Sequence, residues 1–146
     1  MYEKMESDTA MSLARAAGAA MYERDQASQS LGMILEEIRP GYARMRMTVR
    51  ENMLNGHRAC HGGFLFALAD SAFAFACNSY NQNTVGVACT IDYVAPGKLD
   101  DVLTAEASER FLAGKSGVYD VKVSNQQGQV LVLFRGKSLR VNGELV

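Results

Sequence analysis

The chain has little of several residue types that mark other protein classes. Its 146 residues include no tryptophan, two prolines, two histidines and three cysteines. Cys60, Cys77 and Cys89 are odd in number and form no Cys-x-x-Cys pair. We therefore expect reduced thiols in a cytoplasmic protein rather than a disulfide framework. With only His57 and His61 to accompany these widely spaced thiols, no metal site is expected.

Net charge is also small. Fifteen Lys and Arg against sixteen Asp and Glu leave −1, so no nucleic-acid partner is expected. Residues 1–8 mix both charge signs and lack the basic and apolar regions of a secretory leader. One stretch, residues 59–77, approaches membrane length, but Asp70 would lie near its centre at high cost. A helix buried within a protein is therefore expected, with no membrane partner.

What is present suits one globular domain over residues 1–146. Hydrophobic residues make up 48%, enough for a substantial core. We expect an extra Ala-rich N-terminal helix at about 8–27 and a very apolar helix at about 62–78. The strand candidates are 31–39, 42–49, 84–94, 102–110, 118–123 and 130–141. Because the repeated crossover helices of a parallel sheet are missing, the order predicts an α+β fold with an antiparallel sheet around one central helix.

Asp70 is the main anomaly in this pattern. It lies in the middle of the most apolar helix, where a carboxylate is costly unless it has partners or faces a cavity. Desolvation would raise its pKa, which suits a general base. The alternative is an ordinary helix carboxylate that faces solvent.

A second candidate is the sequence His61-Gly62-Gly63 directly before that helix. The glycines allow the backbone to approach a ligand closely, and the first helical N–H groups lack internal partners. An oxyanion would be stabilised there. Asn55-Gly56 is first a turn signal, and the Asn55 amide is a candidate for orienting a carbonyl or a water.

Helix geometry separates the two candidates. Asp70 follows Gly62 by eight residues, which is roughly 12 Å along a helix axis at 1.5 Å per residue. Both cannot touch one reacting atom from a single chain. If they act together, they come from different subunits of a symmetric dimer.

Several short segments then support a family assignment over about residues 31–141. They are Leu54-Asn55-Gly56, His61-Gly62-Gly63, Leu68-Ala69-Asp70, residues 74–78, residues 88–93 with Pro96-Gly97, residues 117–120 and residues 134–138. Together they resemble the hotdog-fold acyl-CoA thioesterases, and most closely the PaaI branch, which acts in phenylacetate degradation. The resemblance implies an antiparallel sheet curled around a long central helix. It also implies hydrolysis of aryl-acyl-CoA thioesters, of the phenylacetyl or hydroxyphenylacetyl type, to the free acid and CoA.

The resemblance also assigns roles. It implies that Asp70 is the catalytic general base or nucleophile, that the Gly62 backbone N–H polarises the thioester carbonyl, and that Asn55 positions water or substrate. His61 and Gly63 would lie at the substrate. The family uses no metal or separate cofactor, since CoA is part of the substrate. Its members are homodimers with interface active sites, often assembled into homotetramers.

The substrate's two ends suggest further contacts. An apolar acyl pocket would be lined by Phe64, Leu68 and Tyr80. Arg135 and Lys137 are two apart on one strand, so they share a sheet face where CoA phosphates would bind. An ordinary solvated charge pair is the alternative for these two side chains.

Two other functions stay open from the sequence. One is an acyl-thioester dehydratase on the same fold, although no histidine lies on the central helix. The other is a non-catalytic module that binds acyl-CoA. The Asp70 carboxylate disfavours the latter, because binding alone gains nothing from a desolvated charge.

Overall fold

The computed structural model describes the backbone of residues 1–146 and every side chain except that of Tyr2. Its elements are α1 (Tyr2–Arg24), α2 (Gln26–Ser30), β1 (Ile34–Arg39), β2 (Tyr42–Thr48), the 3₁₀ turn η1 (Glu51–Met53), α3 (Gly62–Cys77), β3 (Thr84–Tyr93), β4 (Val102–Ala113), β5 (Ser116–Ser124) and β6 (Val130–Arg140).

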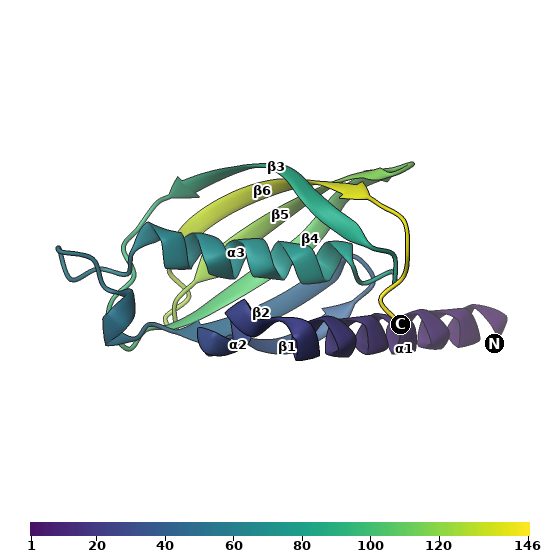
Figure 1. Cartoon of the computed structure of the whole chain (residues 1–146), viewed down its shortest axis with the longest axis horizontal. Helices are drawn as coiled ribbons and strands as arrows, with labels where there is room; N and C mark the ends of the chain where they lie inside the picture. The colour runs from purple at the N-terminus through teal and green to yellow at the C-terminus, as the bar shows by residue number, and fades with distance from the viewer.

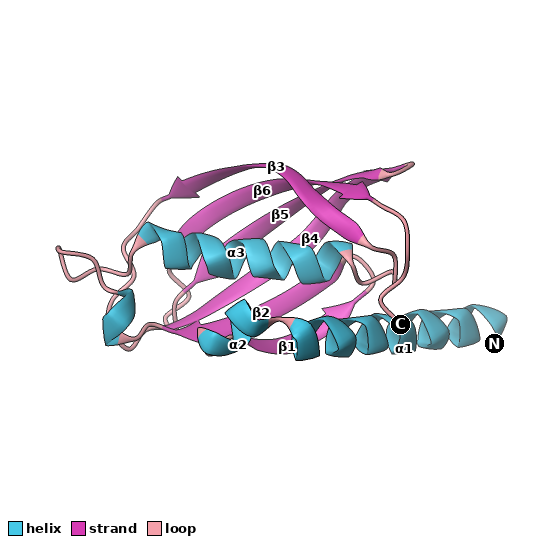
Figure 2. Ribbon diagram, in the orientation of Figure 1, coloured by secondary structure: helices cyan, strands magenta, loops and turns pink.

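The six strands form one antiparallel sheet in the order β1-β2-β4-β5-β6-β3. The sheet curves around α3, and α1 and α2 lie beside β1 (Figures 1 and 2). The predicted antiparallel sheet around a central helix is therefore confirmed. β1 and β3 are the two edge strands, and β3 runs back alongside α3, so its last residues lie near the start of that helix (Figure 1).

The strands follow the alternation of apolar and polar residues in the sequence. In β2, Ala43, Met45 and Met47 are fully buried while Arg44 and Arg46 point away from α3. β4 repeats the pattern with Leu103, Ala105 and Ala107 buried. Since side chains on a strand alternate between its two faces, the apolar sets of these two strands cover α3.

α3 fits the sheet through a close contact between an aromatic ring and glycines. The Phe73 ring lies over Gly136 on β6 and Gly86 on β3, where a Cβ would meet ring atoms at 2.8 Å and 2.9 Å respectively. Phe73 also contacts the rings of Tyr119 and Phe134, at 5.7 Å and 5.8 Å between centroids. The glycines thus allow the helix to approach the β3–β6 side of the sheet closely.

The end of α3 is held by Asn78. Its amide donates to the carbonyls of Ala74 and Thr84, each at 2.9 Å, and its Oδ1 accepts the Thr84 N–H at 2.9 Å. Asn78 therefore caps the C-terminal end of the helix and also ties the helix to the first residue of β3.

Some boundaries differ from those expected. The N-terminal helix expected over 8–27 begins at Tyr2 and ends at Arg24, because Asp25 caps a separate short helix by accepting the Ser28 N–H. The first strand begins at Ile34 rather than residue 31, since Gly32 adopts a φ of +71° in the preceding turn. No described helix is long and apolar enough to cross a membrane.

The Gly136 contact leads to a stability prediction. Gly136→Ala places a methyl group where it would overlap the Phe73 ring. We therefore expect the free energy of unfolding to fall by about 1–3 kcal/mol, despite the usual benefit of replacing a strand glycine. Chemical denaturation measures the change. Gly56→Ala is the matched control, because nothing lies within 4 Å of its Cβ position. Equal stability of the two variants would contradict the packing argument.

Candidate active site

The start of α3 leaves one backbone donor without an acceptor. His61 is the N-cap, and its Nδ1 accepts the Gly63 N–H at 2.9 Å. The Phe64 and Leu65 N–H groups donate to the His61 carbonyl, at 2.9 Å and 3.4 Å. Within the described part of the chain, the Gly62 N–H has no such partner. A hydrogen-bond donor at the positive end of the helix dipole is therefore free to bind a ligand oxygen.

The free Gly62 donor lies at a cleft that the end of β3 helps to form. The cleft is lined by residues 93–96 of β3 and its following loop, by Asn55, Ala59 and Cys60, and by Gly62 and Leu65 of α3. The Tyr93 hydroxyl donates to the Gly62 carbonyl at 3.2 Å, and its ring lies 3.3 Å from the Cβ position of Gly62. Tyr93 was not recognised from the sequence, because a tyrosine at a strand end has no distinctive pattern.

Asn55 contributes to the same cleft with a fixed orientation. Its Oδ1 accepts the N–H groups of His57 and Ala59, at 2.9 Å and 3.2 Å. The oxygen is thus occupied by the loop, which leaves the side-chain NH₂ as the group that can act on a ligand. Asn55 is therefore a donor here, suited to a carbonyl, a water or a thiolate.

Asp70 lies at a second cleft along α3. That cleft is lined by Asp70 and Phe73 and by residues 86–89 of β3. The carboxylate is exposed in the single chain, but its apolar surroundings raise the pKa of Asp70 above the ordinary value. Phe73 was not predicted as a site residue, because its contact with Gly86 depends on how the helix docks on the sheet.

The two clefts share no residue, as the helix-length argument predicts. Both open along β3, which pairs only with β6. Its side chains are unusually exposed for an apolar strand: Val87 is 57% exposed and Tyr93 is 50% exposed. An apolar strand with an unpaired edge is a template for pairing with another strand.

The residues expected to line an acyl pocket are not brought together. Leu68 is fully buried in the core and lines neither cleft, while Phe64 is partly buried beside the His61 ring. Tyr80 follows the far end of α3, where its hydroxyl donates to Glu109 at 2.9 Å. The apolar side chains of α3 that line the two clefts are instead Leu65 and Phe73, and β3 and its following loop add Val87 and Val94.

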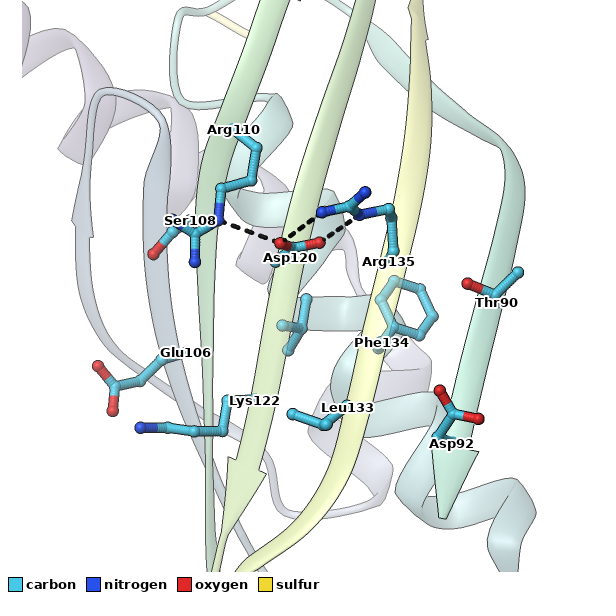
Figure 3. Close-up of a pocket in the computed structure, with 11 residues that line it drawn as sticks. Thr90, Asp92, Glu106, Ser108, Arg110, Asp120, Lys122, Leu133, Phe134 and Arg135 are labelled. Atoms are coloured by element: carbon cyan, nitrogen blue, oxygen red, sulfur yellow. Dashed lines mark hydrogen bonds and ion pairs between the residues drawn. The ribbon is translucent and has the colours of Figure 1, made fainter. Parts of the chain in front are cut away.

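Arg135 and Lys137 share the outer face of the sheet, as the two-residue spacing predicts. The Arg135 guanidinium donates twice to Asp120, at 2.7 Å and 2.9 Å, and Arg110 approaches the same carboxylate at 3.1 Å (Figure 3). These contacts, chiefly the hydrogen bonds from Arg135, lower the pKa of Asp120. The Arg135 guanidinium is therefore already bound within the chain, and it shares Asp120 with Arg110.

Two of the three cysteines are buried within the fold. Burial raises the pKa of Cys60 to about 11 and that of Cys77 to about 12, so neither is a ready nucleophile. Cys89 is exposed on β3 at the Asp70 cleft. Among the residues that the structure describes, no group of three or more His, Cys, Asp or Glu side chains is placed to hold a metal ion.

Comparison with known proteins assigns the family. Residues 57–132, which include the start of α3, Asp70 and β3, match the Thioesterase superfamily. An acyl-coenzyme A thioesterase PaaI of Escherichia coli is 49% identical over 126 residues, which cover 86% of this chain and 90% of that protein. A putative esterase of Archaeoglobus fulgidus is 35% identical over 84% of this chain and 79% of its own length.

Solved structures agree with this assignment. The E. coli PaaI protein from the phenylacetic acid degradation operon superposes with a TM-score of 0.91 and 47% identity, covering 92% of this chain and 97% of that chain. A hypothetical thioesterase of Streptococcus pneumoniae, solved with coenzyme A, gives 0.74 and 28% identity, covering 77% and 90%. The chain belongs to the Thioesterase superfamily and has the hotdog fold. The predicted enzyme class, a thioester hydrolase, is confirmed.

The raised pKa of Asp70 predicts a pH-dependent stability effect. A carboxyl whose pKa is raised on folding favours the folded state while protonated, and this advantage is lost as the pH rises through the folded-state pKa. We therefore expect Asp70→Asn to melt higher than wild type at about pH 7, with the difference vanishing near pH ~3. Thermal unfolding at both pH values measures it.

The matched control for this effect is Asp120→Asn. Because the pKa of Asp120 is lowered on folding, the ionised form stabilises the protein, and this stability is lost as the pH falls. The control should therefore melt lower than wild type at neutral pH. An Asp70→Asn protein that also melts lower would show that the carboxylate makes stabilising contacts instead.

Proposed function

We propose that this chain is an acyl-CoA thioesterase that hydrolyses aryl-acyl-CoA thioesters, of the phenylacetyl or hydroxyphenylacetyl type, to the free acid and CoA. The unpaired Gly62 N–H at the start of α3 carries the proposal, since it is a donor suited to a thioester carbonyl. The E. coli relative named acyl-coenzyme A thioesterase PaaI supports the acyl-CoA substrate, and its operon supports the aryl acyl group.

The active site is proposed to form between two copies of the chain. Antiparallel pairing of two β3 edges about a two-fold axis near Ile91 would place Ala88 of one protomer opposite Val94 of its partner. Ala88 lines the Asp70 cleft and Val94 lines the Gly62 cleft, so the pairing would join them. It would also cover the exposed apolar side chains of β3. Further assembly of dimers into a homotetramer stays a prediction.

In this site the thioester carbonyl accepts the Gly62 N–H of one protomer, with the Asn55 amide as a neighbouring donor. The partner protomer's Asp70 carboxylate removes a proton from water as the water oxygen adds to the carbonyl carbon, or attacks that carbon directly to form an anhydride that water then opens. The C–S bond breaks, the electron pair leaves on the CoA sulfur, and the proton reaches the thiolate. No metal or separate cofactor is needed for these steps.

The CoA phosphates are proposed to lie at the outer face beside β3. Lys137 pairs in register with Ala88, one strand from the edge. In this geometry Lys137 supplies the phosphate contact, and Arg135, bound to Asp120, contributes less. His61 and Gly63 flank Gly62 at the start of α3, and the pantetheine arm is proposed to enter beside Gly63.

Thiol release from a panel of acyl-CoA esters tests the function. We expect phenylacetyl- and hydroxyphenylacetyl-CoA to turn over faster than short- and long-chain acyl-CoA. Asp70→Asn should remove most of the rate, about a hundredfold or more, because its amide cannot take the proton. Asp8→Asn on the exposed face of α1 is the charge-matched control. A panel without any thiol release would favour an acyl-CoA-binding protein.

Gly62→Pro isolates the backbone donor. Gly62 is the first helical residue, where proline is tolerated, and the extended His61 backbone (φ −58°, ψ 134°) suits a following proline. The change removes the N–H, so we expect kcat to fall about 10²–10³-fold. Gly62→Ala is the control, because it adds a Cβ at the same place beside Tyr93 as the proline does but keeps the N–H. This variant should retain most activity.

Mixing the two inactive variants tests the shared site. In a heterodimer of Asp70→Asn with Gly62→Pro, one of the two sites combines an intact Asp70 with an intact Gly62. Random exchange at equal amounts should restore about a quarter of the wild-type activity. No restoration, with exchange shown by mass spectrometry, would place both groups of a site in one chain.

A further inference from the structure

His61 occupies an unusual position at the start of α3. It is the N-cap, yet the acceptor is an imidazole nitrogen rather than the hydroxyl, carboxylate or amide oxygen typical of N-caps. Because Nδ1 accepts the Gly63 N–H at 2.9 Å, it carries no proton, and the ring hydrogen is on Nε2. The cap therefore needs a neutral imidazole in one tautomer.

The first turn of α3 is constrained around the single free donor. The Gly62–Gly63 peptide is held at both ends, since its carbonyl accepts the Tyr93 hydroxyl at 3.2 Å and its N–H donates to His61. On the other side, the His61 N–H donates to the Met53 carbonyl at 2.8 Å and the Cys60 N–H to the Gly97 carbonyl at 2.8 Å. Every neighbouring N–H from Cys60 to Leu65 has an acceptor, and Gly62 is the exception within the described chain.

We infer that His61 is a positioning residue, which directs the Gly62 N–H by binding the adjacent Gly63 N–H. This inference rests on the proposed thioesterase function. Without the cap, a first turn with two glycines would sample other conformations, and the direction of the Gly62 N–H would vary. With Gly63 occupied, the developing oxyanion meets one donor with a fixed direction. His61 thus acts through the backbone, without touching the reacting atoms.

Two substitutions of His61 test the inference: one removes the side-chain acceptor for the Gly63 N–H, and the other supplies a different acceptor. His61→Ala removes the acceptor, and we expect kcat to fall about tenfold or more with KM changed less than about threefold. His61→Asn supplies a side-chain oxygen at the cap and should recover most of the lost kcat, although it has neither imidazole basicity nor the ring. Thermal unfolding checks that all proteins are folded at the assay temperature.

The amide signals of the two glycines give a readout independent of activity. The Gly62 and Gly63 signals are identified in ¹⁵N–¹H spectra of glycine-labelled protein by substituting each glycine in turn and noting which signal disappears. Exchange of the Gly63 amide hydrogen with solvent should be fast in His61→Ala and slow in wild type and His61→Asn. Gly62 should exchange fast in all three, because its N–H has no acceptor.

The possible results separate the inference from the function on which it rests. Wild type without thiol release from any acyl-CoA overturns the proposed function, whatever the exchange data show. An active wild type whose His61→Asn variant is as impaired as His61→Ala overturns the inference, since the imidazole itself is then required. A change confined to KM also overturns it, because that result assigns His61 to direct substrate contact.

Discussion

The docking of α3 against the concave face of the sheet is the interaction on which the rest of the structure depends. The helix is apolar around most of its circumference, and all six strands of the sheet contact it. On the β3–β6 side, Gly136 and Gly86 let the Phe73 ring lie against the sheet backbone. This close approach brings Asp70, one turn before Phe73, next to β3 and forms the cleft that holds its carboxylate.

The same docking determines what the two ends of α3 can do. At its C-terminal end, the Asn78 side chain donates to the Ala74 carbonyl and accepts the N–H of Thr84, the first residue of β3, so that end is closed by the chain itself. At its N-terminal end, His61 and its carbonyl satisfy all but one donor, and that donor faces a cleft. The helix thus has one structural end and one end suited to binding an oxygen with partial negative charge.

The charges outside this region have a different arrangement. On the outer face of the sheet, Asp120 lies between Arg110 and Arg135, so one negative charge is paired with two positive charges (Figure 3). The Asp70 carboxylate has apolar neighbours instead, and its pKa moves in the opposite direction to that of Asp120. One carboxylate is suited to stabilising the fold, and the other is suited to taking up a proton.

The sequence by itself determined the elements, the antiparallel α+β arrangement and the separation of Asp70 from Gly62, because these follow from local periodicity and from the fixed rise of a helix. It also pointed to Asp70 and to the glycines before α3, since a carboxylate in an apolar helix breaks the pattern. Only the tertiary structure decided that Leu68 is core while Leu65 and Phe73 line the clefts, that Arg135 is bound by Asp120, and that Tyr93 contacts Gly62. These facts depend on which strand lies opposite each helical turn, and such long-range contacts leave no periodic signal in the chain.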